Sequence, residues 1–309
     1  MTDWRDAHGD RGDAATVGRS AVGVVGCGLM GSGIAEVFAR VGRPVVVHEV
    51  DAAAAARGRA RIDRSMERAV AAGKLDAADA AAARDRIVVD TDLEALAEVE
   101  LCVEAATEDE DLKTELFGRL DRVLVREDAI LASNTSSVPI MKLGSVTGRP
   151  ERVIGLHFFN PVPVLPLVEI VPSLLTGGDV VEVVQKLVEV ELNKVVIRSK
   201  DRAGFIVNAL LIPYLLSAVR MVESGFASAE DVDAGMVSGC AHPLGPLRLA
   251  DLIGIDTVAA IATSMYAEFK EPLYSPPPML LRMVEAGLLG RKNGRGFYEY
   301  IERSTPPSI

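Results

Sequence analysis

The sequence predicts a mixed α/β fold followed by an all-helical C-terminal part. Two observations carry this prediction. Short apolar runs alternate with helical patterns as far as about residue 200, and from residue 204 onward only helical patterns occur. Strands that alternate with helices predict a largely parallel, doubly wound sheet with helices on both faces. We therefore expect an α/β domain over residues 20–202 and a helical domain over residues 203–309.

The individual elements follow from short apolar runs and from longer amphipathic or alanine-rich stretches. The apolar runs predict strands at residues 21–25, 44–49, 87–90, 101–103, 129–133, 153–157, 167–171 and 194–197. The longer stretches predict helices at residues 31–41, 52–72, 76–84, 109–125 and 179–192. The helical part begins with the long apolar segment 205–221, and the prolines at 276–278 predict a loop over residues 274–278.

The composition argues against several classes of protein. A net charge of −11 gives the chain as a whole no electrostatic reason to bind nucleic acid or an anionic membrane. No apolar stretch is long enough to span a bilayer. The three scattered cysteines, Cys27, Cys102 and Cys240, fit neither a disulfide framework nor a metal site, and they are typical of a reducing, cytoplasmic compartment. We interpret residues 1–19, which are charged and lack an apolar run, as a disordered tail.

A glycine-rich turn follows the first predicted strand. Its sequence, Gly26-Cys27-Gly28-Leu29-Met30-Gly31, is a G-x-G-x-x-G motif. The first glycine permits a tight turn, the second lets the backbone approach a pyrophosphate, and the third lets the helix pack on the strand. The phosphates would lie at a helix N-terminus, where free N–H groups favour anions. Because the motif lies in the first βαβ unit, it predicts a Rossmann-type dinucleotide site.

An acidic residue that binds the ribose hydroxyls is expected about twenty positions after the glycines. Glu49, at the end of the second predicted strand, and Asp51 both qualify. Asp51 directly precedes the alanine-rich helix, where it would cap the free N–H groups. We therefore assign the ribose to Glu49. A carboxylate at this place repels a 2′-phosphate, which favours NAD over NADP.

A histidine and a glutamate form the second feature with chemical meaning. His157 ends a predicted strand, and Glu169 interrupts the apolar strand that follows. A carboxylate among apolar neighbours costs several kcal/mol unless a charged or hydrogen-bonding group meets it, and His157 is the natural partner. Such a carboxylate raises the basicity of the other ring nitrogen and produces the general base that a dehydrogenase needs. The alternative is a structural histidine with a solvated glutamate at a strand edge.

Several further strings occur together in consistent order between about residue 20 and residue 302. They are Gly26–Gly33, Val103-Glu104-Ala105, Ser133-Asn134-Thr135-Ser136-Ser137, His157-Phe158-Phe159-Asn160-Pro161, Gly204-Phe205-Ile206-Val207-Asn208, His242-Pro243-Leu244-Gly245-Pro246 and Gly294-Arg295-Gly296-Phe297-Tyr298. These strings resemble the 3-hydroxyacyl-CoA dehydrogenase family, most closely its bacterial short-chain, 3-hydroxybutyryl-CoA type. The resemblance implies NAD-dependent, reversible oxidation of a short (3S)-3-hydroxyacyl-CoA to the 3-oxoacyl-CoA in fatty acid metabolism. It also implies a Rossmann-type domain and a helical domain through which the chain forms a homodimer.

The resemblance implies a role for each matching residue. His157 would be the catalytic base, Glu169 its partner, and Ser136 and Asn208 hydrogen-bond donors to the reacting oxygen. Glu108 and Lys113 would lie beside the nicotinamide ribose, Asn160 and Ser136 near the nicotinamide, and Lys292 in the cofactor region. The complete expected cofactor site consists of Gly26, Gly28, Leu29, Met30, Gly31, Glu49, Ala105, Glu108, Lys113, Ser136, Asn160 and Lys292, with no metal.

Three of these residues have simpler interpretations. Ser136 and Ser137 precede Pro139 and could cap a helix. Asn208 could be an ordinary polar residue of the long helix. Lys113 lies in a charged helical stretch and could be a surface ion-pair partner that contributes little to stability.

An acidic protein that binds CoA needs a local cluster of positive charge. In the alanine-rich helix Arg57, Arg61, Arg64 and Arg68 recur at spacings that place them on one face. The resemblance implies that this region receives the CoA and that Ser65 contacts it. We expect the acyl-CoA site to contain Ser65, Arg64, Arg68 and Lys74. A solvated helix face, with Asp63 and Glu67 as ion-pair partners, is the alternative.

Two other functions remain possible for the same scaffold. One is a dehydrogenase of a sugar acid, against which the arginine stripe argues. The other is a non-catalytic structural or NAD-sensing protein. A purely structural protein has no need of the four residues His157, Glu169, Ser136 and Asn208 together.

Overall fold

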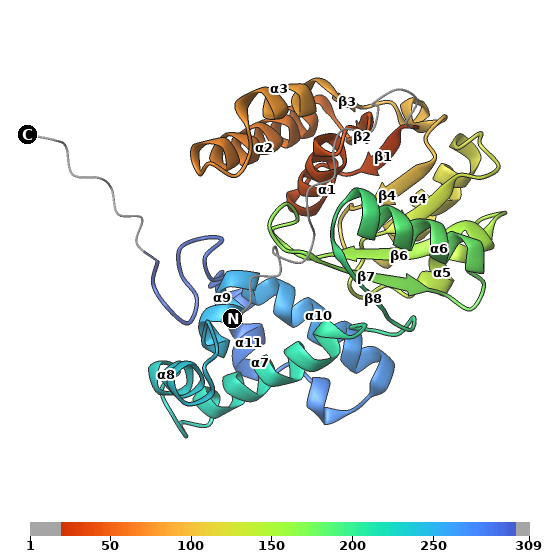
Figure 1. The fold of residues 1–309 in the computed structure, drawn as a ribbon. Helices are drawn as coiled ribbons and strands as arrows, with labels where there is room; N and C mark the ends of the chain where they lie inside the picture. Colours follow the sequence, from red (N-terminus) through yellow and green to blue (C-terminus); the bar gives the residue numbers. More distant parts are fainter. Residues whose placement is uncertain (1–19, 301–309) are drawn as a thin grey trace, which may run out of the picture.

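The computed structural model describes residues 20–300. These residues form an α/β part built on one sheet, and a helical part that follows it (Figure 1). The predicted fold class, a doubly wound sheet followed by helices, is confirmed. The tail predicted at residues 1–19 lies outside the described residues.

The sheet has eight strands in the order β3-β2-β1-β4-β5-β6-β7-β8. Their bounds are β1 Val22–Val25, β2 Val45–His48, β3 Ile87–Asp90, β4 Leu101–Glu104, β5 Ile130–Ser133, β6 Val153–Phe158, β7 Leu167–Pro172 and β8 Val195–Arg198. Each strand lies within a residue of its predicted range, because turn residues bound each apolar run. All neighbouring strands are parallel except β6 and β7, which run antiparallel with His157 opposite Glu169.

Helices cover both faces of this sheet, and each face has its own hydrophobic core. On one face pack α1 (Leu29–Arg40), α2 (Ala52–Ala71), α3 (Ala77–Asp85) and α6 (Gly178–Lys186). On the other pack η2 (Leu93–Leu96), α4 (Glu110–Val123) and α5 (Ile140–Gly144). The helix predicted at residues 179–192 ends as a π-helical turn, η4 (Leu187–Glu191), and the short α5 was not predicted. The remaining short segment on this part is η3 (Pro150–Arg152).

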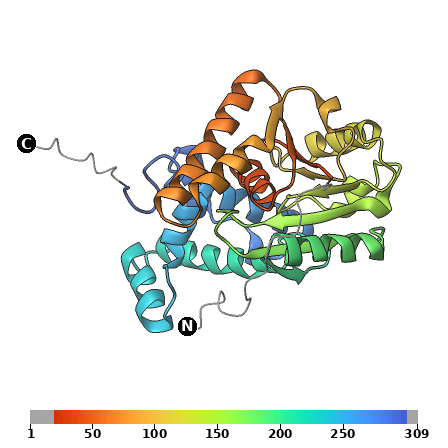
Figure 2. The ribbon, with the colours of Figure 1, turned by 45° about the horizontal axis from the view of Figure 1, so that its top comes forward.

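The hairpin of α2 and α3 projects beyond the sheet (Figures 1 and 2). The fully buried residues of α2 end at Met66, and the last turn of this helix and the connection after it are largely exposed apart from Val70 and Leu75, which pack against the core. α2 packs on α1, and Arg61 in the middle of α2 reaches the glycine loop.

The helical part has a third core of its own. It consists of α7 (Val207–Glu223), α8 (Ala229–Cys240), α9 (Pro246–Ile253), α10 (Ile255–Phe269), η5 (Pro272–Tyr274) and α11 (Pro278–Glu285). The predicted proline-rich loop is confirmed, and α11 begins at the last of its prolines, since the first turn of a helix needs no proline N–H.

A buried aspartate fastens the segment 290–300 to α9. Asp251 is fully buried and accepts hydrogen bonds from the N–H groups of Phe297 and Tyr298 at 2.9 and 3.0 Å. The Tyr300 hydroxyl donates to the same carboxylate at 3.0 Å. Three donors from one segment therefore meet a charge that would otherwise be buried without compensation.

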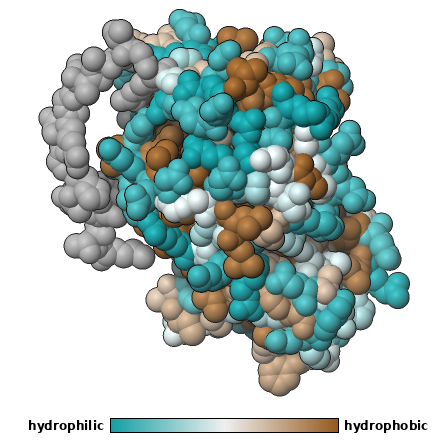
Figure 3. Space-filling model, turned by 90° about the vertical axis from the view of Figure 1, so that its right-hand side faces the viewer, coloured by the Kyte–Doolittle hydropathy of each residue, from teal (hydrophilic) through white to brown (hydrophobic). Residues whose placement is uncertain are grey.

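The surface alternates between hydrophilic and hydrophobic residues in small patches on the face that Figure 3 shows. Within residues 20–300, no single helix is both long and apolar enough to cross a membrane. The bent pair of α9 and α10 meets that test only when the two helices are counted together.

Candidate active site

The glycine loop joins β1 to α1 at the carboxyl edge of the sheet. Gly26 has φ +88°, which a side chain would strain. A Cβ at Gly31 would lie 1.8 Å from the Gly26 carbonyl oxygen, so only glycine fits this position. α1 begins at Leu29 with Gly28 as its N-cap, two residues earlier than predicted, and Gly28 has open space around its Cα. The loop therefore has the shape that brings an anion close to the N–H groups of a helix N-terminus.

Glu49 contacts the glycine loop. Its carboxylate accepts hydrogen bonds from the N–H of Cys27 at 2.6 Å and from its neighbour Val50 at 3.1 Å. Asp51 instead accepts from the N–H of Ala54 at 2.7 Å and caps α2, so its predicted structural role is confirmed. One acid therefore caps a helix, and the other binds the backbone of the glycine loop.

Cys27 fills the first variable position of the loop with a buried thiol. A Cβ on Gly58 of α2 would lie 2.5 Å from the Cβ of Cys27, so the cysteine packs directly against the helix backbone. Burial, and to a smaller extent the charge of Glu49, raises the pKa of the Cys27 thiol to about 12. The thiol is therefore protonated at neutral pH and serves packing.

His157 and Glu169 form a buried pair across the antiparallel strands β6 and β7. The Nδ1 atom of His157 lies 2.7 Å from Oε2 of Glu169, so the contact predicted from the sequence is present. Glu169 is fully buried, and the alternative of a solvated glutamate at a strand edge is wrong. The rings of Phe159 and Phe205 lie edge-on to the imidazole, with centroids 4.6 and 5.5 Å away.

The second oxygen of Glu169 binds the start of the helical part. Oε1 accepts hydrogen bonds from the N–H groups of Ile206 and Val207, both at 3.0 Å. These N–H groups belong to the first turn of α7, where they have no partner within the helix. One carboxylate thus caps a helix and orients the imidazole. If Nδ1 donates to Glu169, Nε2 is left as the acceptor of a proton.

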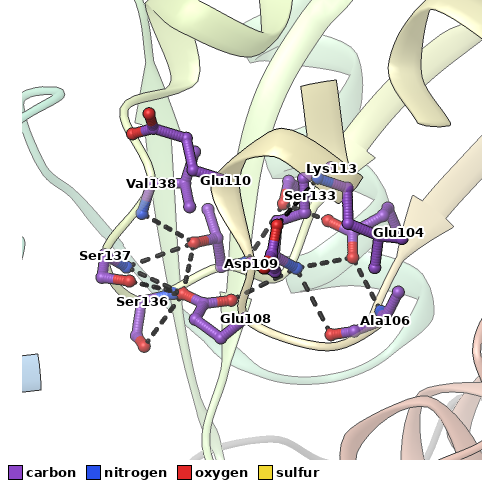
Figure 4. A network of polar contacts seen from close by, with 12 residues as sticks. Glu104, Ala106, Glu108, Asp109, Glu110, Lys113, Ser133, Ser136, Ser137 and Val138 are labelled. Atoms are coloured by element: carbon purple, nitrogen blue, oxygen red, sulfur yellow. Dashed lines mark hydrogen bonds and ion pairs between the residues drawn. The ribbon is translucent and has the colours of Figure 1, made fainter. Parts of the chain in front are cut away.

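A second buried network lies where β4 and β5 end (Figure 4). The ammonium of Lys113 lies 2.6 Å from Glu104 and 3.2 Å from Glu108, and both Lys113 and Glu104 are almost completely buried. The interpretation of Lys113 as a surface ion-pair partner is therefore wrong. Ser133 Oγ and the N–H of Ala106 also donate to Glu104, at 2.6 and 2.7 Å.

Glu108 gathers the donors of the loop after β5. Its Oε1 accepts from the N–H groups of Ser136 and Ser137 at 2.9 and 3.1 Å, and from the hydroxyls of Thr135 and Ser137 at 2.5 and 2.8 Å. Burial raises the pKa of Glu108, but the charge of Lys113 and these hydrogen bonds outweigh it, so the pKa lies below its ordinary value. Glu108 therefore carries a negative charge at neutral pH.

The two serines do not cap α5. Asp201 fills that role, because its carboxylate accepts from the N–H groups of Ile140 and Met141 at 2.8 and 2.7 Å. The capping interpretation of Ser136 and Ser137 is therefore wrong. The Ser136 hydroxyl turns toward Glu108, at 3.4 Å, and makes no hydrogen bond to His157.

Asn208 lies in the first turn of α7, next to Val207, whose N–H binds Glu169. Its side chain is buried and makes no hydrogen bond to another residue of the described range. Asn160 is exposed two residues after the end of β6, and Ala105 follows β4 beside Gly26. These residues therefore lie near the ends of strands at the same edge of the sheet.

Lys292 lies in the helical part and not at the glycine loop. Its ammonium donates to both oxygens of Asp256 at 2.7 and 3.0 Å, and to the Thr257 hydroxyl at 2.9 Å. The structure thus does not bring Lys292 to the other expected cofactor residues.

The arginines of α2 divide into two groups. Arg64 and Lys74 are exposed, and neither makes an ion pair with a residue of the part of the chain that the structure describes. Arg68 is exposed. Ser65 is half-buried beside the carboxylate of Glu36 in α1. Burial raises the pKa of Glu36, and the hydrogen bond with Ser65 offsets only part of that rise. Arg61, in contrast, turns to the glycine loop and donates to the Cys27 carbonyl at 2.7 Å.

The expected neighbours Asp63 and Glu67 do not neutralise the stripe. Asp63 pairs with Arg59 and Arg84, and Glu67 lies 3.8 Å from Arg84. Both acids therefore lie on the side of α2 that faces α3, so Arg64 and Arg68 keep their charge toward solvent.

Sequence reasoning overlooked three residues that position this site: Glu104, Asn134 and Asp201. Glu104, like Glu169, is a carboxylate in an apolar strand, so the argument that identified Glu169 would also have identified Glu104. Asn134 accepts a hydrogen bond from the N–H of Phe158 at 2.9 Å and ties the end of β6 to the loop after β5. Asp201 lies some sixty residues from its partners, and no local pattern marks it.

Two family models match the chain. The model described as "3-hydroxyacyl-CoA dehydrogenase, NAD binding domain" matches residues 21–202. The model described as "3-hydroxyacyl-CoA dehydrogenase, C-terminal domain" matches residues 204–300. Together they span nearly all of the described residues.

Individual relatives agree with these matches. A 3-hydroxybutyryl-CoA dehydrogenase of Mycobacterium tuberculosis is 57% identical over 279 residues, which are 90% of this chain and 98% of that protein. The human mitochondrial hydroxyacyl-coenzyme A dehydrogenase is 39% identical over 288 residues, 90% of each chain. The crystal structure of M. tuberculosis FadB2 superposes with a TM-score of 0.89 at 57% identity, covering 91% of this chain and 98% of that chain. Ralstonia eutropha PaaH1, an (S)-3-hydroxybutyryl-CoA dehydrogenase, superposes with a TM-score of 0.85 at 44% identity, covering 92% and 99%. The chain therefore belongs to the 3-hydroxyacyl-CoA dehydrogenase family.

Proposed function

We propose that this protein is an NAD-dependent oxidoreductase that reversibly oxidises a short (3S)-3-hydroxyacyl-CoA, such as 3-hydroxybutyryl-CoA, to the 3-oxoacyl-CoA. The observation that carries this proposal is the buried His157–Glu169 pair, 2.7 Å apart. β6 is parallel to β5 and so, through β4, to β1, which puts His157 at the same edge of the sheet as the glycine loop. Ligands of doubly wound sheets bind outside this edge.

In the proposed mechanism His157 takes the proton of the substrate hydroxyl on Nε2. Glu169 holds Nδ1 and stabilises the imidazolium that results, and in the reverse direction His157 returns the proton. Bound NAD supplies the hydride acceptor. Ser136 and Asn208 would donate hydrogen bonds to the reacting oxygen, where charge develops. In this structure the Ser136 hydroxyl lies 3.4 Å from Glu108.

The cofactor site that we propose follows the edge of the sheet. The glycine loop with Leu29 and Met30 would hold the pyrophosphate, Glu49 the adenosine ribose, and Glu108 with Lys113 the nicotinamide ribose. The support for the last pair is the ion pair between Lys113 and Glu108 and the contacts of Glu108 with the loop of Ser136. Ala105, Asn160 and Lys292 complete the proposed site, although Lys292 would have to leave Asp256 to reach it.

We propose that the CoA moiety binds along α2 through Ser65, Arg64, Arg68 and Lys74. The support is charge: in a chain of net charge −11, these exposed cations project on a hairpin that leaves the sheet. Phosphate groups of CoA carry the complementary charge.

Replacement of His157 by Gln tests the proposed function. We expect that His157→Gln abolishes NADH oxidation with acetoacetyl-CoA as substrate but leaves NADH binding intact. Longer 3-oxoacyl-CoA thioesters, with NADPH as control, would define the chain length. Turnover by His157→Gln near that of the unaltered protein would refute the assignment of the base.

Two alternatives stay in view. A diketoreductase and a dehydrogenase of a pyridine carboxylic acid, each 27% identical in sequence, share this fold, so the scaffold also occurs in enzymes whose names mention no CoA. A screen of sugar acids and other hydroxy acids against 3-hydroxybutyryl-CoA discriminates between these readings. A non-catalytic, NAD-binding structural protein would fail in every such assay.

We also propose that the chain divides into two domains at residues 202 and 203 and forms a homodimer through its helical domain in the cytoplasm, within fatty acid metabolism. The separate hydrophobic core of the helical part supports the division. Leu210 and Phe226, 74% and 78% exposed on this part, support an interface there. Size-exclusion chromatography with light scattering measures the oligomeric state directly.

A further inference from the structure

Two charged side chains hold the backbone of Cys27 in the glycine loop. Its N–H donates to Glu49 at 2.6 Å, and its carbonyl accepts from the Nη1 of Arg61 at 2.7 Å. Glu49 follows β2, and Arg61 lies in the middle of α2. The same loop residue is therefore held between an anion on one side and a cation on the other.

Arg61 keeps most of its hydrogen-bonding capacity. A guanidinium carries five N–H donors in a planar fork, and Arg61 uses one of them on a residue of the range 20–300. It forms no direct ion pair with Glu49, although both lie in the described chain and both contact Cys27. The side chain is half-buried, whereas Arg64, less than one helical turn further along α2, is exposed.

The chemical difference between NAD and NADP suggests a function for this arrangement. NADP differs from NAD by a phosphate on the 2′-hydroxyl of the adenosine ribose. Rossmann-type sites bind the free hydroxyls with an acidic residue and accommodate the 2′-phosphate with a nearby arginine. Here both side chains contact one residue of the glycine loop. Arginine also binds phosphate oxygens in bidentate geometry, which the unused donors of Arg61 allow.

We propose that Arg61 is a specificity-determining residue of the dinucleotide site and that the carboxylate of Glu49 is what prevents it from binding the 2′-phosphate of NADP. This inference rests on the proposed assignment of Glu49 to the adenosine ribose. With Glu49 present, Arg61 orients the carbonyl of Cys27, and the negative charge repels a 2′-phosphate. Without that charge, the free N–H groups of Arg61 bind the phosphate. Arg61 thus acts on the dinucleotide, and the CoA stripe of α2 begins at Arg64.

The test measures the Kd of NADH and of NADPH by fluorescence titration of the full chain, without acyl-CoA. Glu49→Ser should bind NADH about tenfold more weakly or worse, because it loses charge-assisted hydrogen bonds, and NADPH about tenfold more tightly. Adding Arg61→Met should cancel the gain in NADPH affinity. Adding Arg64→Met, a matched change on the same helix, should leave the gain in place. Arg61→Met alone should weaken NADH binding severalfold through the loop, with no gain for NADPH.

The outcomes separate this inference from the assignment on which it rests. If Glu49→Ser leaves the Kd of NADH unchanged, the ribose assignment fails. If NADH binding weakens but NADPH binding does not improve, or improves equally without Arg61, the ribose assignment stands and the role of Arg61 is overturned. Glu49→Gln keeps an acceptor for the N–H of Cys27 while it removes the charge. It should also gain NADPH affinity in an Arg61-dependent way, and a failure to do so counts against the inference even if Glu49→Ser disturbs the loop.

Discussion

Replacing Glu169 by Gln changes one heavy atom and tests how His157, the proposed base, is held. The carboxylate accepts from two N–H groups of α7 with one oxygen and faces His157 Nδ1 with the other. A glutamine amide has one acceptor oxygen and one donor group. The amide oxygen can therefore accept from the N–H groups of α7 or from a protonated Nδ1 of His157, but not from both.

The structure indicates which of the two the amide satisfies. If the NH₂ group faced α7, two buried N–H donors would lose their acceptor, at about 1–3 kcal/mol for each. The oxygen therefore turns to α7, and the NH₂ group donates to His157 Nδ1. The ring proton then lies on Nε2, so the base is occupied. At about 1.4 kcal/mol for each factor of ten, a preference of about 2 kcal/mol or more leaves a few per cent or less of the molecules in the productive arrangement.

The loss of charge adds to this effect, because the imidazolium of His157 would no longer face a carboxylate. In a Ser-His-Asp triad the comparable change of an acid to its amide lowers kcat about 10⁴-fold. We expect a decrease of about 10³- to 10⁴-fold for Glu169→Gln in NADH oxidation with acetoacetyl-CoA, with NADH binding unchanged. Glu182→Gln, an exposed change of the same charge on α6, is the matched control. A Glu169→Gln protein that retains kcat within tenfold of the control would refute this account of the pair.

Three further outcomes are expected. Reversing Arg64 and Arg68 to Glu should raise the KM for acetoacetyl-CoA about tenfold, since exposed charges contribute up to about 1 kcal/mol each, and should leave the Kd of NADH unchanged. An unaltered KM would show that these residues do not belong to the proposed CoA site. Lys113→Met leaves the buried carboxylate of Glu104 without its cation and should lower the free energy of unfolding in urea by about 3–5 kcal/mol. The double change with Glu104→Gln should recover part of this loss, and an equal loss in both variants contradicts the pairing. In native protein a thiol reagent should modify Cys240 rapidly and Cys27 and Cys102 slowly. Cys240 is the exposed one of the three, and burial raises the pKa of the other two thiols to about 12. Rapid loss of all three thiols below pH 9 would contradict this prediction.

Periodicity predicted the sheet well because its signal is local. Each strand is a short apolar run between turn residues, and a buried parallel strand requires no more than that. The His157–Glu169 contact was also predictable, since a carboxylate within an apolar strand requires a nearby partner. The alternative interpretations of Lys113 and Ser136 failed for the opposite reason. Their partners, Glu104 and Glu108, lie in other elements, and sequence spacing does not show depth.

The arginines of α2 show a related limit. Helical spacing places Arg61 on the same face as Arg64 and Arg68, and that placement says where each side chain starts. It does not say that the glycine loop lies within reach of Arg61, because that proximity depends on the packing of α2 on α1. Likewise, the second contact of Glu169 is made by backbone N–H groups of α7, and any residue except proline could provide them. No pattern of side chains reports such a contact.

The aspartate that fastens the segment 290–300 to α9 affects the order in which the protein matures. The donors that reach Asp251 from this segment are the backbone N–H groups of Phe297 and Tyr298 and the hydroxyl of Tyr300, and they are synthesised some fifty residues after it. Until they leave the ribosome, α9 carries an uncompensated charge at the position that its core must bury. The charge of Asp251 therefore gains these partners only once this segment has been synthesised, and removal of residues 297–300 would leave a charge whose burial costs about 3–5 kcal/mol. A tag fused after residue 300 must leave these donors free to reach Asp251.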